Sequence, residues 1–355
     1  MNQRIENIRR KMQKADLQGM IITNSSNLRY VLGFDVEGMI FITDKENLFI
    51  TDGRYIEYAN SKLTIDDDIA VVNIADLSTD DNLAFFADCD RVGFEEYDLT
   101  YYDYTNMVQK YRISEMVETN GIVEKLRIIK DDDEIRSLEK ACLITDKCFE
   151  HLKTFIKIGM TEKDIAFEIY KYFIEHGADG LAFDSIVASG VNSSKPHAIP
   201  TDKKIEYGDV IVMDFGAKYN GYCADMTRTI FVGDVDKNFE RLYNFILNVQ
   251  MNVIKMYVNG GDSKIIANSV EDEFNEDNYT LIHALGHGVG IDIHEKPVIS
   301  GRFSTILKNN MVVTNEPGIY IPEKIGIRIE DTIVINNNIP IILTKSSKKL
   351  TVING

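Results

Sequence analysis

Two segments of the sequence share one pattern. The first is GDVIVMDFG at residues 208–216, followed by YCADMTRT at residues 222–229. The second is MVVTNEPG at residues 311–318, followed by GIRIEDT at residues 326–332. In each, an apolar run ends in a carboxylate with a glycine two residues later, and the chain returns through a carboxylate with a threonine two residues later. The pattern indicates a duplicated unit that contains a β-hairpin.

Two helical stretches are predicted before each of these segments. The first begins after the acidic residues 131–133, which suit the positive end of a helix dipole. The second begins at Thr161, whose hydroxyl can cap the helix with Asp164 three residues further on. The later pair covers residues 236–258 and 262–275. We therefore predict an α+β domain built from two helix-helix-hairpin units.

The N-terminal part of the chain has a different character. Its first helix places Ile5, Ile8, Met12 and Ala15 on one face. Short apolar runs then alternate with turns, at residues 19–23, 39–43, 48–51, 69–72 and 91–94. This pattern is typical of a small α/β domain. The expected division is residues 1–125 for this domain and residues 126–355 for the duplicated one.

The composition excludes several classes of protein. The 355 residues include 39 basic and 56 acidic side chains, so the formal charge is −17. Such a surface repels phosphate backbones and anionic lipid, and we expect neither nucleic acid nor a membrane as partner. The N-terminal helix lacks a signal-peptide core, which favours a soluble, cytoplasmic protein. The four cysteines have neither zinc-site spacing nor the density of a disulfide scaffold, so we expect free thiols.

Four acidic residues at the ends of apolar strands are difficult to explain structurally. They are Asp214, Asp225, Glu316 and Glu330. A buried carboxylate without a partner costs several kcal/mol or becomes protonated. For one such acid a salt bridge is the simpler explanation, but four in a repeated frame are better balanced by two divalent cations.

Three of the six histidines fall in one glycine-rich segment, HALGHGVGIDIHE, at residues 283–295. The segment lacks the HExxH order of zinc peptidases, and the chain has neither a phosphate-binding P-loop nor a GxSxG elbow. His151 and His176, which lie in helical stretches, are interpreted as structural. The candidate functional histidines are His283, His287 and His294.

These motifs resemble the metallopeptidases with the pita-bread fold, which include aminopeptidase P, prolidase and methionine aminopeptidase. The similar stretches are DFGAKYNGYCADMTRT, HALGHGVGIDIHEKP, NEPGIYIP and GIRIED. ITNSSNLRYVLGFD and FITDGRYIEYA also resemble the smaller N-terminal domain of the branch that cleaves Xaa-Pro bonds. Methionine aminopeptidases lack that domain, and creatinase, which shares both domains, has lost the metal ligands.

The resemblance implies a role for each candidate residue. Two divalent metal ions would be held by Asp214, Asp225, His287, Glu316 and Glu330. Glu316 would also move a proton from the attacking water to the leaving nitrogen, and His294 would stabilise the tetrahedral intermediate. The substrate would be oriented by His283 and His197. Arg328 would hold Glu330 or a substrate carboxylate, and we favour the supporting role.

The expected reaction is hydrolysis of the bond between an N-terminal residue and a following proline, by a hydroxide that bridges the two metals. Manganese is the first expectation for the metal, with cobalt or zinc as alternatives. We expect proline-containing dipeptides or short peptides as substrates and a homodimer as the assembly. The motifs do not separate prolidase from aminopeptidase P. Two further alternatives are a catalytically silent peptide-binding module on the same fold and a creatinase-like hydrolase.

Overall fold

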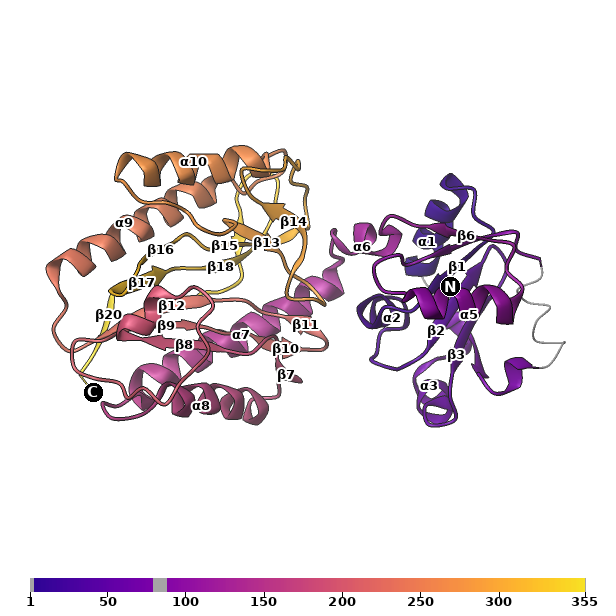
Figure 1. The fold of residues 1–355 in the computed structure, drawn as a ribbon, viewed down its shortest axis with the longest axis horizontal. Coiled ribbons are helices and arrows are strands. Elements are labelled where there is room, and N and C mark those ends of the chain that lie inside the picture. The colour runs from indigo at the N-terminus through magenta and orange to yellow at the C-terminus, as the bar shows by residue number, and fades with distance from the viewer. Residues whose placement is uncertain (1–2, 79–87, 355) are drawn as a thin grey trace. The chain divides into compact units, whose positions relative to one another are not determined.

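The computed structural model describes residues 3–78 and 88–354 (Figure 1). The chain divides into two compact units, Met1–Arg127 and Ile128–Gly355. In the described parts of the chain, no helix combines the length and apolar character needed to cross a membrane.

The first unit is built around a six-stranded mixed sheet. Its strands are β1 (Gly19–Ile22), β2 (Met39–Thr43), β3 (Asn47–Thr51), β4 (Ala70–Asn73), β5 (Arg91–Phe94) and β6 (Glu115–Glu118). They are ordered β4-β3-β2-β1-β5-β6. The helices are α1 (Gln3–Lys14), α2 (Ser25–Leu32), α3 (Ile56–Lys62), α5 (Tyr101–Tyr111) and α6 (Ile122–Arg127), with 3-10 turns η1 (Ile65–Asp67) and η2 (Asp76–Ser78).

The predicted strands of this unit are present, and the apolar face of α1 is buried through Ile5, Ile8 and Met12. Ala15 lies beyond the end of α1 and is exposed, so its place on that face was wrongly predicted. Helix α2 was not predicted from periodicity. It is defined by its ends instead, because Asn24 caps its first backbone N–H groups and Gly33 ends it at φ 86°.

The second unit consists of two similar halves (Figure 1). The first half contains α7 (Asp132–Phe155), α8 (Glu162–Glu175), β9 (Val210–Asp214), β10 (Ala217–Tyr219), β11 (Tyr222–Cys223) and β12 (Thr227–Val232). The second half contains α9 (Lys237–Val253), α10 (Ser263–Glu276), β15 (Val312–Asn315), β16 (Gly318–Ile321), β17 (Ile325–Arg328) and β18 (Asp331–Val334). The predicted duplication of a helix-helix-hairpin unit is confirmed.

Short elements complete this unit. They are β7 (Gly180–Leu181), β8 (Ile186–Ser189), η3 (Gly190–Ser194), η4 (Ile254–Met256), β13 (Gly286–Gly288), β14 (Glu295–Ile299), β19 (Ile341–Ile342) and β20 (Thr351–Ile353). The larger sheets have the orders β20-β12-β9-β8 and β14-β13-β15-β18-β19, while β11-β10-β7 and β16-β17 form smaller ones.

The helices of each half bury their apolar faces on its strands. In the first half, Phe149 of α7 and Phe173 of α8 share a core with Met213 and Ile230 of the strands. In the second half a corresponding core contains residues of α9, α10, β15 and β18. The caps match the sequence prediction at α8, where Thr161 and Asp164 form a capping box.

The two hairpins interrupt their ladders at equivalent places. β9 pairs with β12, and the short pair β10 and β11 lies between these two strands in the sequence. In the same way, β15 pairs with β18, and β16 pairs with β17. Residues 224–226, 316–317 and 329–330 lie between the strands, and they contain Asp225, Glu316 and Glu330. These acids are therefore not bound by the alternating side-chain directions of a regular strand.

Candidate metal centre

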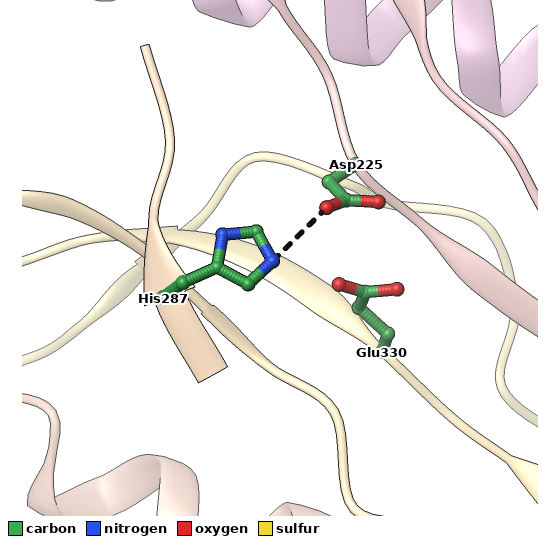
Figure 2. Close-up of side chains that lie close together, drawn as sticks. All are labelled: Asp225, His287 and Glu330. Carbon is green, nitrogen blue, oxygen red and sulfur yellow. Dashed lines mark ion pairs between the residues drawn. The ribbon is translucent and has the colours of Figure 1, made fainter. Parts of the chain in front are cut away.

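Three side chains from different elements converge in the second unit (Figure 2). Each of Asp225, His287 and Glu330 offers one potential ligand atom, and these atoms all lie within 4.8 Å of one another. The His287 Nε2 atom is 3.4 Å from Asp225 Oδ2. Asp225 and Glu330 lie in the two hairpin interruptions, and His287 lies in β13.

The other two predicted ligands border this group. Glu316 Oε1 is 3.4 Å from His287 Nε2. Asp214 ends β9, and its Oδ2 accepts a hydrogen bond from Arg328 Nη2 at 2.7 Å. Its Oδ1 is buried and has no hydrogen-bond partner. The structure therefore brings all five predicted residues to one site and leaves a buried oxygen available to a ligand.

The electrostatics of the site call for positive charge. Burial, and then the neighbouring Glu330 and Asp214, raise the pKa of Asp225 well above its usual value. The pKa of Glu330 is raised in the same way, by burial and then by Glu316 and Asp214. Several ionised carboxylates in so small a volume repel one another, and divalent cations would remove that repulsion. The donor set of carboxylate oxygens and one imidazole fits such ions.

His287 is prepared to act as a ligand. Its Nδ1 lies 3.0 Å from the carbonyl oxygen of Gly288, which can only accept a hydrogen bond. Nδ1 therefore carries the hydrogen, and the lone pair of Nε2 faces the acids. Burial lowers the pKa of His287, so the neutral imidazole is favoured.

The threonines of the two repeated motifs support the acids. Thr227 Oγ1 donates to Glu330 Oε2 at 2.6 Å, and Thr332 Oγ1 donates to the Asp225 carbonyl at 2.7 Å. Each threonine thus contacts the acid segment of the other half. This reciprocal arrangement gives a physical reason for the carboxylate-x-Thr pattern in both copies.

The sequence favoured a supporting role for Arg328 at Glu330, and the structure gives its guanidinium other hydrogen-bond partners. Its Nη2 contacts Asp214, and its Nε donates to Thr227 Oγ1 at 2.9 Å rather than to Glu330. Tyr320 was missed in the sequence, although it lies in the motif NEPGIYIP. Its hydroxyl accepts a hydrogen bond from Arg328 Nη1 and lies 3.2 Å from His283 Nε2.

The remaining predicted histidines surround the acids. The ring of His294 is 4.4 Å from that of His287, measured between centroids. His283 Nδ1 is 4.0 Å from Glu316 Oε2. His197 is exposed and lies close enough to contribute to the lowered pKa values of His283 and His294, for which burial is the largest cause. Uncharged imidazoles are thus favoured at both positions.

The glycines of the histidine segment serve strand packing. A Cβ atom added at Gly286 would lie 2.1 Å from the backbone oxygen of Thr314. Only glycine allows β13 to approach β15 this closely, and this approach carries His287 to the acids.

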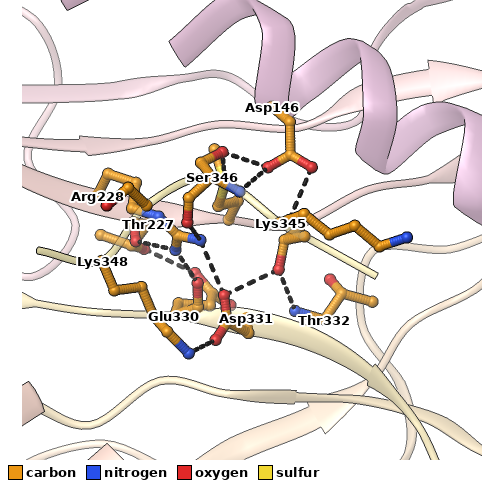
Figure 3. Close-up of polar contacts among 12 residues, drawn as sticks. Asp146, Thr227, Arg228, Glu330, Asp331, Thr332, Lys345, Ser346 and Lys348 are labelled. Atoms are coloured by element: carbon orange, nitrogen blue, oxygen red, sulfur yellow. Dashed lines mark hydrogen bonds and ion pairs between the residues drawn. The ribbon is translucent and has the colours of Figure 1, made fainter. Parts of the chain in front are cut away.

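A buried polar network adjoins Glu330 (Figure 3). Its central carboxylate, that of Asp331, is fully buried. It accepts hydrogen bonds from Arg228 at 2.9 Å, Gln250 at 2.8 Å and Thr344 at 3.0 Å, and it forms an ion pair with Lys348. Arg228 also donates to the carbonyl of Glu330, so the network fixes the backbone of a predicted ligand.

Comparison with known proteins identifies the class. Residues 136–337 match metallopeptidase family M24, and residues 4–129 match the creatinase/prolidase N-terminal domain. The chain belongs to metallopeptidase family M24 and has its two-domain pita-bread fold, as the sequence predicted.

Individual relatives match along almost the whole chain. The Xaa-Pro dipeptidase structure from Bacillus anthracis is 37% identical with a TM-score of 0.93, and 99% of each chain is covered. The X-Pro aminopeptidase structure from Thermotoga maritima is 31% identical with a TM-score of 0.88, covering 97% of this chain and 100% of the other. The Xaa-Pro dipeptidase of Pyrococcus furiosus is 35% identical over 99% of this chain and 100% of its own.

Proposed function

We propose that this metallopeptidase is an exopeptidase that hydrolyses the bond between an N-terminal residue and a following proline, using two divalent metal ions. The observation that carries the proposal is the convergence of Asp225, His287 and Glu330, bordered by Asp214 and Glu316. The names of the similar dipeptidases and aminopeptidase support the substrate class.

The proposed metal ligands are the five residues of this centre. Asp214, Asp225, His287, Glu316 and Glu330 would hold the ions through their carboxylate oxygens and one imidazole nitrogen. When bound, the ions would polarise the scissile carbonyl and acidify a water molecule. We propose manganese, and cobalt and zinc are alternatives because oxygen and imidazole donors suit all three.

The side chains around the centre supply the remaining chemistry. Burial raises the pKa of Glu316, which suits a group that accepts a proton from water and passes it to the departing proline nitrogen. His294 would stabilise the oxyanion of the tetrahedral intermediate. His283 and His197 would orient the peptide, while Arg328 would hold Asp214 in place.

The alternatives are weaker explanations of this site. A silent peptide-binding module would need neither an unpartnered oxygen at Asp214 nor four convergent acids. A creatinase-like hydrolase, which lacks the metal ligands, would likewise not need these four acids. An Xaa-Pro bond, in contrast, is a tertiary amide without an N–H group, which general proteases bind poorly, so a dedicated site is reasonable.

The test compares hydrolysis of Ala-Pro and Ala-Pro-Ala by metal-free protein after addition of manganese, cobalt or zinc. We expect cleavage of Ala-Pro that depends on added metal and is lost on chelation, with Ala-Ala as the control substrate. Cleavage of Ala-Pro alone defines a dipeptidase, and cleavage of Ala-Pro-Ala defines the aminopeptidase P type. Full activity without metal would refute the proposal.

We also propose a homodimer in the cytoplasm, with a domain boundary after residue 125. All four cysteines are free and buried, which supports a reducing compartment. The division of the chain into two compact units falls between residues 127 and 128, two residues beyond the proposed boundary, and supports a boundary in this stretch.

A further inference from the structure

The carboxylate of Glu162 ties together both ends of one segment, residues 189–201. Glu162 is the first residue of α8 and is fully buried. Its Oε1 accepts hydrogen bonds from the backbone N–H and the hydroxyl of Ser189, at 2.7 and 2.8 Å. Its Oε2 accepts from the backbone N–H and the hydroxyl of Thr201, at 2.9 and 2.6 Å. Between these ends, Asn192 Nδ2 donates to Oε1 at 3.1 Å.

The middle of the segment is attached to the other half of the unit. Ser193 Oγ accepts a hydrogen bond from the backbone N–H of Gly326 at 2.9 Å. A Cβ atom at Gly326 would lie 1.9 Å from the Ser193 backbone oxygen, so glycine is required there. The carbonyl of Pro196 accepts from Arg328 Nη1 at 3.3 Å. Residues 189–201 are thus attached to Glu162 at both ends and, through Pro196, to the arginine that contacts Asp214. His197 is the next residue after Pro196.

The charge of Glu162 is balanced by this segment. Burial alone would raise the pKa of Glu162, but the hydrogen bonds from Thr201 and Ser189 outweigh it and lower the pKa. The positive end of the α8 dipole adds to this effect. Within residues 3–78 and 88–354, no lysine or arginine forms an ion pair with Glu162. An ionised carboxylate is therefore buried with the donors of residues 189–201 as its main partners.

We propose that Glu162 is a positioning residue of the reaction, which fixes residues 189–201 so that His197 stands at the metal centre. The inference rests on the proposed function, in which His197 orients the peptide. Glu162 itself contacts neither the acids of the centre nor their threonines, so it acts through the segment alone.

The first test is the Glu162→Gln variant. An amide has only one acceptor oxygen, and its NH2 group faces N–H donors, so one end of the segment is released. We expect kcat/KM for Ala-Pro to fall roughly 10- to 100-fold, mostly through KM, while metal content stays at the wild-type level. In a His197→Ala background the same substitution should have little further effect.

Thr201 provides a second test that does not alter the buried acid. Thr201→Val removes the hydroxyl donor at an exposed position, and we expect a rise in KM of about 3- to 10-fold. Thr201→Ser keeps the hydroxyl donor and should have the wild-type KM. Asp164→Asn is the matched control, because Asp164 also caps α8 but contacts Thr161 rather than the segment.

The outcomes separate this inference from the proposed function. If Glu162→Gln lowers kcat/KM equally with and without His197, Glu162 does not act through His197 and the inference is wrong. The inference also fails if Asp164→Asn raises KM as strongly as Glu162→Gln, since the effect then belongs to the helix. Failure of the wild-type protein to cleave either Ala-Pro or Ala-Pro-Ala with any metal would instead refute the proposed function.

Discussion

Three of the four acids of the metal centre have one carboxylate oxygen that accepts a hydrogen bond from a neighbouring side chain. Thr227 donates to Glu330 and Arg328 donates to Asp214. Thr314 Oγ1 donates to Glu316 Oε1 at 3.2 Å. A donor on one oxygen orients the carboxylate and leaves the second oxygen for a cation, which is how supporting groups tune metal ligands.

Arg328 should not tolerate replacement by lysine. Its guanidinium contacts Asp214, Tyr320 and Thr227 with three different nitrogens, whereas an ammonium group provides a single point of contact. We expect Arg328→Lys to reduce kcat/KM roughly 10- to 100-fold and to weaken metal retention during dialysis. The control is Arg136→Lys, at an exposed ion pair with Asp133. Wild-type kinetics for Arg328→Lys would contradict the supporting role.

Glu316 should be separable into a ligand and a base. In Glu316→Gln the amide oxygen can still accept from Thr314 and contact a metal, but it cannot carry the transferred proton. We therefore expect near-normal metal content, measured by elemental analysis, and a loss of turnover of about 100-fold or more. Glu323→Gln, at an exposed turn, serves as the control. Turnover close to wild type would rule out the assigned proton transfer.

The sequence predicted the ligand candidates better than the residues around them. The four candidate acids recur in a duplicated frame, and acids within apolar runs have few structural explanations. Tyr320 gave no such signal, because a tyrosine in a strand is most often a packing residue. Glu162 was also missed, because an acid in the first helical turn is explained by the helix dipole alone. Only the fold shows that residues 189 and 201 meet at its carboxylate.

At the scale of elements, the interrupted hairpins depend on the network behind them. Thr227 faces Glu330 at the centre, and the next residue, Arg228, faces Asp331 on the opposite side. Successive residues of a strand point to opposite faces, so the pair Thr227 and Glu330 lies at the metal centre and the ion pair of Arg228 and Asp331 lies in the core. The segment with Thr344 and Lys348 closes this core from the C-terminal end of the chain.

The Asp331→Asn substitution should be strongly destabilising. It leaves the buried Arg228 and the partly buried Lys348 with a neutral amide in place of their anion. Loss of one partner of a buried ion pair costs about 3–5 kcal/mol, so we expect a decrease of that size in the free energy of unfolding, measured by urea denaturation. Asp133→Asn, at an exposed pair in the first turn of α7, should lower the denaturation midpoint only slightly. Equal midpoints for both variants would argue against a structural role of the network.

The stability contributed by Glu162 should depend on pH. Its folded pKa is lowered from 4.5, so its ionised form contributes fully above that value and the contribution is lost as pH falls through the lower, folded pKa. The difference in Tm between the wild type and Glu162→Gln should thus be largest near neutral pH and shrink in acid. Thermal scans from about pH 7 to about pH 3.5 test this. A gap that widens in acid would show that the carboxyl is held protonated.

At the scale of the whole molecule, the net charge is distributed unevenly. The formal value of −17 includes four acids that meet at one buried centre. The two divalent ions proposed for this centre would bring the chain to −17 + 4 = −13. The sequence predicted this accumulation, whereas the degree of burial and the mutual repulsion of the acids required the folded arrangement of both halves.

Metal removal should therefore destabilise the folded chain as well as abolish activity. A ligand that binds only the folded state at about 100 times its Kd adds about 2.7 kcal/mol, which corresponds to a rise in Tm of about 5 °C or more for a domain of this size. We expect chelated protein to unfold earlier and added manganese to restore the wild-type Tm, in differential scanning calorimetry. Potassium chloride at matched ionic strength controls for simple screening.

A charge-deletion variant separates relief of repulsion from other effects of metal. The doubly substituted Asp225→Asn/Glu330→Gln protein lacks two of the converging anions and two of the predicted ligands. In metal-free buffer it should melt at or above the Tm of the metal-free wild type, because less repulsion remains. It should gain no stability from manganese. A variant that melts well below the metal-free wild type, or that still responds to manganese, would show that these two acids do not form the centre.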